Sequence, residues 1–282
     1  MNTIKYLGVA GLAAVGLFAT QAFATTCPTA PGTGTQTQGA PVCIAPVGTD
    51  GAGTGLQALL DGITQSGTPN IDVYHGQTSP SAYWSTSASG LGENRIMFEI
   101  AGYANTNSFG IFDPTDSTKR LQLFGGSASH NAATTLMWNG DGSFIATYLD
   151  GNGQSLGTAG ATFGATNLFG YYLDNGHGQI FYSVLGLNSD GTPHMVAYQG
   201  NGQTRLDNVK TGQYATFGIS DYILAWEDLP FGASDLDYND FVVMVESVHP
   251  VPEPATLGMF GCGVLLIGVA VGLNRRRRFN VG

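Results

Sequence analysis

Short turn sequences rich in glycine and asparagine recur along the middle of this chain and constrain its fold most strongly. They occupy residues 139–142, 150–153, 190–191 and 200–202. Glycine and asparagine adopt the positive φ that tight hairpin turns need. Around these turns lie apolar runs of strand length: Arg95–Tyr103, Ser108–Phe112, Arg120–Phe124, Thr134–Trp138, Ser143–Leu149, Leu168–Leu173, Gln179–Leu185, His194–Tyr198, Tyr222–Glu227 and Phe241–Val248. The pattern predicts an all-β fold, an antiparallel β-sandwich or jelly-roll-like domain.

One short helix is predicted ahead of the strands. Within residues 55–65 the apolar side chains recur at helical spacing; they are Leu56, Leu59, Leu60 and Ile63. Residues 25–54 are dominated by threonine, glycine, proline and glutamine, which predicts a flexible leader. The sandwich domain is therefore expected at residues 55–249, a length that can bury a single core.

The first 24 residues have the pattern of a secretory signal peptide. Lys5 precedes an apolar stretch at residues 7–19, and the segment closes on Ala22-Phe23-Ala24. Signal peptidase cuts after such small-x-small sequences. A transmembrane helix is the alternative, which the short apolar core and the cleavage pattern disfavour. We expect export with removal of residues 1–24.

A second apolar segment lies near the other end of the chain. Residues 257–273 are uncharged and long enough for a single transmembrane helix, and Arg275, Arg276, Arg277 and Arg278 follow it. Clustered arginines stay on the cytoplasmic side, so the domain would lie outside the membrane. The same arginines argue against the alternative of a buried core helix.

Pro252, Glu253 and Pro254 stand immediately before this segment. The order of these three residues, a short apolar helix and an arginine cluster resembles the PEP-CTERM sorting signal of Gram-negative bacteria, over residues 251–278. The resemblance implies that an exosortase recognises Pro252, Glu253 and Pro254 and cleaves nearby. It further implies that the chain is anchored transiently in the inner membrane and then reaches the cell surface or extracellular matrix.

Two of the three cysteines lie outside the apolar segments. Cys262 falls in the predicted transmembrane helix, whereas Cys27 and Cys43 lie in the leader. An even pair in an oxidising compartment predicts a disulfide between Cys27 and Cys43. Two free thiols are the alternative.

The exported part of the chain is strongly acidic. Residues 25–250 hold 19 carboxylates against 5 lysines and arginines. Such a surface repels phosphate backbones, which excludes nucleic acid as a partner.

Five carboxylates and one amide are concentrated at residues 227–240. They are Glu227, Asp228, Asp235, Asp237, Asn239 and Asp240. Carboxylates this close repel one another unless a cation neutralises them, and Ca²⁺ prefers carboxylate, amide and carbonyl oxygens. We therefore predict one calcium cage made of all six residues. A solvated acidic turn, in which these side chains cap backbone amides, is the alternative.

The same segment carries a second resemblance. The sequences of residues 226–229 and 234–240, with upstream matches at 109–113 and 187–194, resemble a domain of unknown function common in PEP-CTERM proteins and bacterial adhesin-like surface proteins. The likeness spans residues 56–248 and implies a β-sandwich and calcium binding, with no established reaction. Phe231-Gly232-Ala233 departs from the more usual glycine-rich run, which leaves the loop geometry in doubt.

No catalytic signature accompanies these features. The sequence lacks Gly-x-Ser-x-Gly, His-Glu-x-x-His, Cys-x-x-Cys and a phosphate-binding loop. We expect a non-enzymatic, calcium-binding structural or adhesive protein of the cell surface or exopolysaccharide matrix. One alternative is a carbohydrate-binding module that stacks sugars on aromatic rings, from Tyr74, Tyr83, Trp84, Trp138, Tyr171 and Tyr172. A secreted hydrolase using Ser127, Ser129 and His130 is a weaker one. His194 beside Asp190 is interpreted as support for a turn, with a second cation as the alternative.

Overall fold

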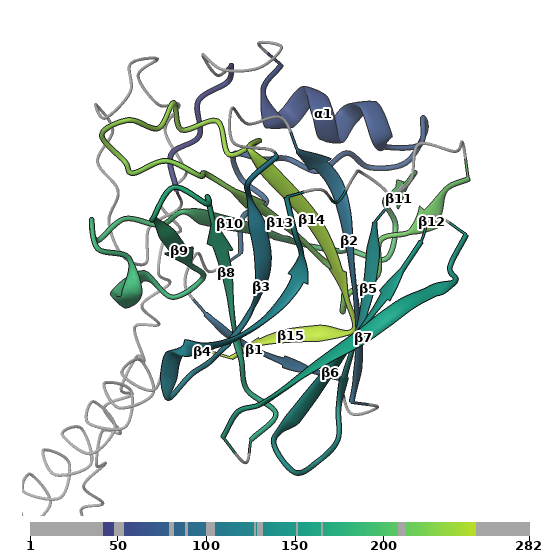
Figure 1. The fold of residues 1–282 in the computed structure, drawn as a ribbon. Coiled ribbons are helices and arrows are strands. Elements are labelled where there is room, and N and C mark those ends of the chain that lie inside the picture. The colour runs from purple at the N-terminus through teal and green to yellow at the C-terminus, as the bar shows by residue number, and fades with distance from the viewer. Residues whose placement is uncertain are drawn as a thin grey trace, which may run out of the picture.

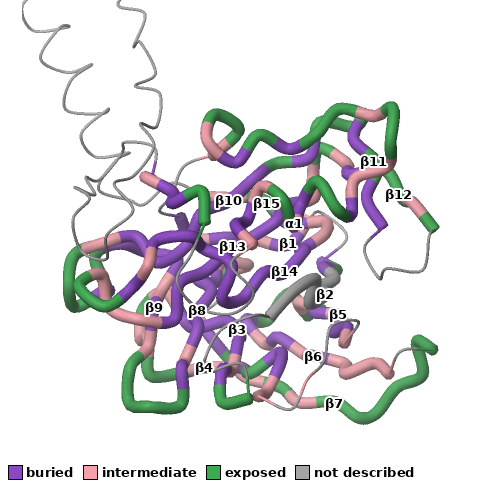
Figure 2. The backbone as a smooth tube through the Cα atoms, turned by 90° about the horizontal axis from the view of Figure 1, so that it is seen from above, coloured by how far each residue is buried: buried purple, intermediate pink, exposed green. Residues whose placement is uncertain are grey.

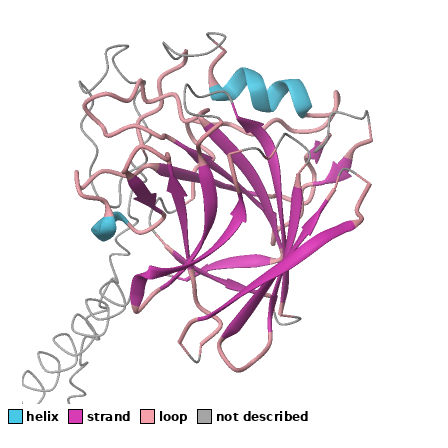
Figure 3. Ribbon diagram, in the orientation of Figure 1, coloured by secondary structure: helices cyan, strands magenta, loops and turns pink. Residues whose placement is uncertain are grey.

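A computed structural model describes residues 42–47, 54–78, 82–87, 90–99, 105–126, 128, 132–150, 152–164, 166–207 and 213–251. The described part is mainly β-structure with one α-helix on its outside (Figures 1 and 3). The predicted signal peptide, the predicted transmembrane segment and the sorting motif lie outside the described residues. Within the described ranges, no helix is sufficiently long and apolar to cross a membrane.

The largest sheet has seven strands in the order β10-β13-β14-β2-β5-β6-β7. Its strands are β2 (Leu91–Glu99), β5 (Ala133–Trp138), β6 (Ser143–Leu149), β7 (Ser155–Thr162), β10 (Met195–Gln199), β13 (Tyr222–Trp226) and β14 (Phe241–Glu246). All neighbouring pairs in it are antiparallel. Gly140 and Gly142 have positive φ in the β5–β6 hairpin, as its turn sequence predicts.

A four-stranded antiparallel sheet in the order β4-β3-β8-β9 forms the second layer. Its strands are β3 (Ser108–Asp113), β4 (Asp116–Phe124), β8 (Gly170–Asp174) and β9 (Ile180–Tyr182). Two small sheets pair β1 (Tyr83–Thr86) with β15 (Val248–Val251), and β11 (Arg205–Leu206) with β12 (Ala215–Thr216). The helices are α1 (Leu56–Ile63) and a 3₁₀ turn at Leu185–Leu187.

The main core lies between the two large sheets. Phe109 of β3 is fully buried, and its ring lies 5.2 Å from those of Tyr171 and Phe241 and 5.9 Å from that of Trp226. These four side chains come from β3, β8, β14 and β13, so aromatic packing joins the two layers. Buried positions accordingly cluster where the sheets face each other (Figure 2).

A second core covers the opposite face of the seven-stranded sheet. Leu56 and Leu60 of α1 pack there with Ile223 of β13 and Val242 of β14. Side chains alternate along a strand, so each of the two strands serves both cores. The main core receives the even positions of β13 and the odd positions of β14, and the core beneath α1 receives the others. That is why the described side chains of β13 are all buried, and why its sequence reads as a continuous apolar run.

The fold agrees with the coarse prediction of an all-β, sandwich-like domain of antiparallel sheets with one short helix. The predicted strand at residues 143–149 is β6 to the residue. Four strands lie in segments without a strand prediction, namely β1, β7, β11 and β12. The predicted run 241–248 ends earlier, because a positive φ at Ser247 separates β14 from β15.

Residues 42–47 differ from the predicted flexible leader. Val42 and Ile44 are buried in the core beneath α1. The Val42 amide donates to Gln77 Oε1 at 2.8 Å, and Gln77 Nε2 donates back to the Val42 carbonyl at 2.9 Å. The overall composition of residues 25–54 does not reveal this, because two apolar residues and one hydrogen-bonded glutamine are enough to hold the short segment in place.

Gly110 in β3 permits a close approach between strands, which gives a stability prediction. A Cβ at this position would lie 2.3 Å from the Leu121 carbonyl oxygen and 2.8 Å from the Tyr172 ring. We expect Gly110→Ala to lower the free energy of unfolding by about 1–3 kcal/mol through overpacking. Gly62→Ala is the control: it has open space in α1 and should stabilise by roughly 0.5–1 kcal/mol. Urea unfolding measures both, and equal effects would refute the steric argument.

Candidate metal centre

The predicted acidic segment forms the connection between β13 and β14. Trp226 and Phe241 face each other as the last pair of the two strands, so residues 227–240 start and end at one point. Five of the six predicted ligands are at least 98% buried, and Asp235 is half-buried. A solvated acidic turn would expose these side chains, so the burial disagrees with that alternative.

Glu227 and Asp228 lie on different sides of the seven-stranded sheet. Trp226 belongs to the core between the sheets, whereas Ala225 belongs to the core beneath α1. Because side chains alternate, Glu227 continues the α1 side and Asp228 continues the inter-sheet side. Their contacts agree: Tyr238, which bonds Glu227, belongs to the α1-side core, and Asn107, which bonds Asp228, lies beside β3. Glu227 and Asp228, two of the six predicted ligands, therefore belong to different centres.

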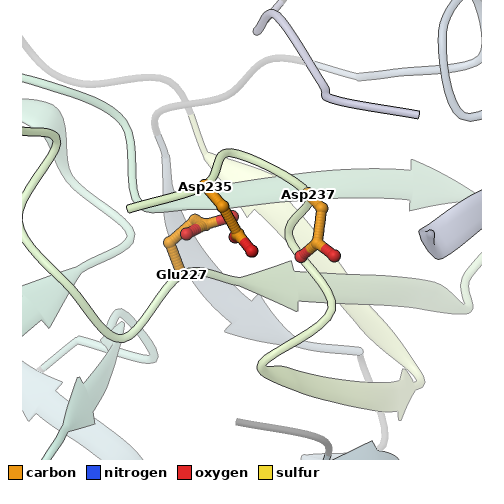
Figure 4. A group of neighbouring side chains, drawn as sticks. All are labelled: Glu227, Asp235 and Asp237. Carbon is orange, nitrogen blue, oxygen red and sulfur yellow. The ribbon is translucent and has the colours of Figure 1, made fainter. Parts of the chain in front are cut away.

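The first centre contains Glu227, Asp235 and Asp237 (Figure 4). One carboxylate oxygen from each lies within 4.8 Å of the others. The Ser234 hydroxyl donates to Glu227 Oε2, and the Tyr238 amide donates to Glu227 Oε1 at 2.6 Å. These bonds fix the Glu227 carboxylate against the loop that carries both aspartates.

Two buried anchors hold the loop backbone in an unusual conformation. Leu236 and Tyr238 have φ of 64° and 55°, which costs side chains other than glycine roughly 1–2 kcal/mol each. The Leu236 carbonyl accepts from the Ala45 amide at 2.7 Å, and the Tyr238 hydroxyl donates to the Pro193 carbonyl at 2.7 Å. Asp235, Asp237 and Asn239 alternate with these anchors along the chain, and their polar groups lie close together.

Asn239 adds an amide oxygen to this centre. Its Nδ2 donates to Asp237 Oδ2 and, at 3.0 Å, to the Thr54 carbonyl. Its Oδ1 is buried and has no hydrogen-bond donor within the described part of the chain. Rotating the amide would set Oδ1 against two acceptors, so the hydrogen bonds fix this orientation.

The electrostatics of the first centre disfavour three ionised carboxylates without a cation. The pKa of Glu227 is raised to about 8, chiefly by burial and also by the charges of Asp237 and Asp235, although the bonds from Ser234 and Tyr238 act to lower it. A hard divalent cation would compensate the negative charges of the carboxylates, and Asn239 Oδ1 would serve as a further ligand. The donor set, three carboxylates and one amide oxygen, fits such an ion.

The second centre is built around Asp228. The Asp228 amide donates to Asp240 Oδ2 at 2.9 Å. Asn107 Nδ2 donates to Asp228 Oδ2 at 2.9 Å, and Asn175 Nδ2 donates to the Asp228 carbonyl at 3.0 Å. Sequence reasoning missed Asn107, Asn175 and Ser234. The position of Ser234 inside the acidic loop was a signal for it, whereas nothing local pointed to the asparagines.

Asp190 and His194 support the acidic loop from outside. His194 Nε2 lies 2.8 Å from Asp190 Oδ2, which also accepts from the Phe231 amide at 3.1 Å. Partial burial raises the pKa of Asp190, but the hydrogen bond and charge of His194 outweigh it and hold that pKa well below the ordinary value. The His194 carbonyl accepts from the Glu227 amide, so the predicted turn-supporting role agrees with the contacts.

The residues predicted for sugar binding, hydrolysis, sorting and the disulfide are distinct from those of these two centres. Trp84 and Tyr171 are fully buried in the main core and Tyr172 is 5% exposed, so these three do not form an open stacking face for sugars. Ser127, Ser129 and His130 lie outside the described residues, as do Cys27 and the sorting residues. Cys43 is disulfide-bonded.

A β-sandwich-like domain with a buried acidic loop is thus the class of protein that the described residues define. A family model described as "Domain of unknown function (DUF4114)" matches residues 140–248. No curated protein matches the chain. The match includes the whole acidic loop but excludes β2 and β5, which pair with β14 and β6 inside it. The folded unit therefore extends beyond the matched residues.

Proposed function

We propose that this chain is an exported, non-enzymatic protein that binds calcium through its β13–β14 loop and has a structural or adhesive role at the cell surface or in the exopolysaccharide matrix. The observation that carries the proposal is the convergence of Glu227, Asp235 and Asp237, with carboxylate oxygens within 4.8 Å of one another in a largely buried loop. In this role the ion would join the loop to the end of β13 and stabilise the fold.

Calcium is favoured over other cations by the donor chemistry. Glu227, Asp235, Asp237 and Asn239 offer only oxygen atoms, and neither histidine nor cysteine is part of the group. Hard oxygen donors suit Ca²⁺ and Mg²⁺, whereas zinc sites usually include nitrogen or sulfur. Mg²⁺ demands near-ideal octahedral geometry and keeps several waters, so a compact set of protein oxygens favours Ca²⁺.

Calorimetric titration of the full-length chain tests the calcium site. We expect Ca²⁺ to bind with a dissociation constant of about 10⁻⁴–10⁻³ M, as in extracellular modules, and Mg²⁺ to bind more weakly. Heats of dilution alone, at millimolar calcium, would refute metal binding. Equal affinity for both ions would refute the assignment to calcium.

Export and sorting rest on the sequence features at the two ends of the chain. The signal peptide at residues 1–24 and the PEP-CTERM-like segment at 251–278 support processing by signal peptidase and an exosortase, with transient anchoring in the membrane. Calcium is scarce in the cytosol and abundant outside, so a site with millimolar affinity would fill after export.

Mass spectrometry of the mature protein tests this route. We expect a chain that begins at Thr25 and ends close to Pro254, recovered from the cell surface or matrix. A mature chain that retains Arg275–Arg278 would contradict sorting by cleavage, without affecting the calcium proposal.

A further inference from the structure

A buried asparagine from the second sheet reaches into the polar cluster on the inter-sheet side. Asn107 directly precedes β3 and is only 2% exposed. Its amide group is directed at Asp228, because Nδ2 donates to Asp228 Oδ2 at 2.9 Å. Its Oδ1 has no hydrogen-bond donor among the described residues.

The hydrogen bond to Asp228 fixes which way the amide faces. With the amide rotated, Oδ1 would meet the carboxylate oxygen of Asp228, and two acceptors would repel each other. The carbonyl oxygen of Asn107 is therefore a buried acceptor whose need for a positive partner is not met by the described protein groups.

Two carboxylates belong to the same hydrogen-bonded group as the Asn107 amide. Asp228 holds the amide of Asn107, and its own backbone amide donates to Asp240 Oδ2 at 2.9 Å. Both aspartates are 2% exposed, and the sequence carries no lysine or arginine between Lys210 and Arg275. An amide oxygen and two carboxylates in a buried position form a set of hard oxygen donors.

We infer that Asn107, Asp228 and Asp240 form a second site for a divalent cation, of the calcium type, distinct from the site at Glu227, Asp235 and Asp237. Glu227 and Asp228 are consecutive residues that follow β13, so their side chains are directed to opposite faces of the seven-stranded sheet. The second site joins the start of β3 to the β13–β14 loop, and so links the two layers of the sandwich. It goes beyond the proposed function, since either site can bind without the other.

Calcium stoichiometry of the full-length chain is the first test. Equilibrium dialysis against millimolar CaCl₂ should give two ions per wild-type chain, one in Asp228→Asn, and one in Asp235→Asn/Asp237→Asn. One ion in the wild type that persists in Asp228→Asn would overturn the second site and leave the first intact. Loss of an ion in Asp228→Asn, with none lost in the double variant, would support the second site and overturn the first.

Asn107→Asp gives a readout that does not depend on a soluble, fully folded Asp228→Asn variant. In chelator, the new carboxylate faces Asp228 without a donor, so the melting temperature should fall below that of the wild type. In calcium, the same carboxylate becomes an additional charged ligand, so the deficit should disappear or reverse. A purely structural Asn107, which only donates to Asp228, would give the same deficit in both conditions, and that result would overturn the inference.

Asn188→Asp is the matched control. Asn188 is also a buried asparagine, but its Oδ1 accepts from the Tyr182 amide and its Nδ2 donates to the Tyr182 and Thr192 carbonyls. We expect this variant to lose stability to the same extent with calcium and with chelator. Equal rescue of Asn188→Asp and Asn107→Asp by calcium would count against a site at Asn107.

Discussion

Calcium at 10 mM is expected to raise the melting temperature of the full-length chain by roughly 5–10 °C over its value in chelator. The estimate takes a dissociation constant of about 10⁻⁴ M, for which a hundredfold excess of ligand stabilises the folded state by about 2.7 kcal/mol. In domains of 150–250 residues, 1 kcal/mol shifts the melting temperature by about 2–4 °C. Differential scanning calorimetry measures the shift directly.

Asp235→Asn/Asp237→Asn should reduce this shift by at least half, because it removes two of the three carboxylates that converge in the first centre. Asp141→Asn/Asp150→Asn is the control, since it changes net charge equally but lies in exposed hairpin turns. The control should keep the full calcium shift. If both double variants respond to calcium like the wild type, the ion does not bind at Asp235 and Asp237.

Glu227→Gln is expected to stabilise the calcium-free protein and to weaken its response to calcium. Burial first, and then Asp237 and Asp235, raise the pKa of Glu227 from about 4.5 in the unfolded chain to about 8. At pH 7 Glu227 is ionised in the unfolded chain and protonated in the folded one. This difference lowers the free energy of unfolding by something on the order of 3 kcal/mol. Glutamine has the same shape, still accepts from the Tyr238 amide and has no charge to lose. In chelator its melting temperature should exceed that of the wild type by several degrees.

The pH dependence has a definite sign. Because the pKa of Glu227 is raised by folding, its contribution to stability is complete below about pH 4.5 and is lost as the pH rises to about 8. The advantage of Glu227→Gln in EDTA should therefore grow from pH 5 to pH 8. Asp61→Asn, at an exposed carboxylate of α1, should show no such trend. An advantage that is the same at pH 5 and pH 8 would show that Glu227 ionises normally in the folded chain.

The strands that sequence reasoning located best are those fixed by local turn chemistry. Strands β5 and β6 follow from the glycine-rich turn between them and from the apolar residues on either side. Strand β7 was missed because its sequence, Ser-Leu-Gly-Thr-Ala-Gly-Ala-Thr, has a single large apolar residue, Leu156, and is mostly exposed. Its conformation depends on pairing with β6 at the sheet edge, which no local pattern encodes.

The candidate site shows the same division between local and distant information. All six predicted ligands lie within 14 residues, so their proximity could be predicted from the sequence. Their division into two centres depends on the two faces of β13, and each face is defined by a different packing partner. Asn107 lies 121 residues from Asp228 in the chain, so only the fold could place it there.

Strand β15 has a consequence for how a sorting enzyme could reach its target. It pairs with β1 up to Val251, and Pro252 is the next residue. An enzyme that grips Pro252, Glu253 and Pro254 would therefore work directly against a folded body, with no spacer in between. Detaching the four residues of β15 from β1 would add about 13 Å of extended chain between the folded domain and Pro252. If the proposed sorting takes place, the mechanical strength of this one short strand pair would set how closely the folded domain must approach the protease.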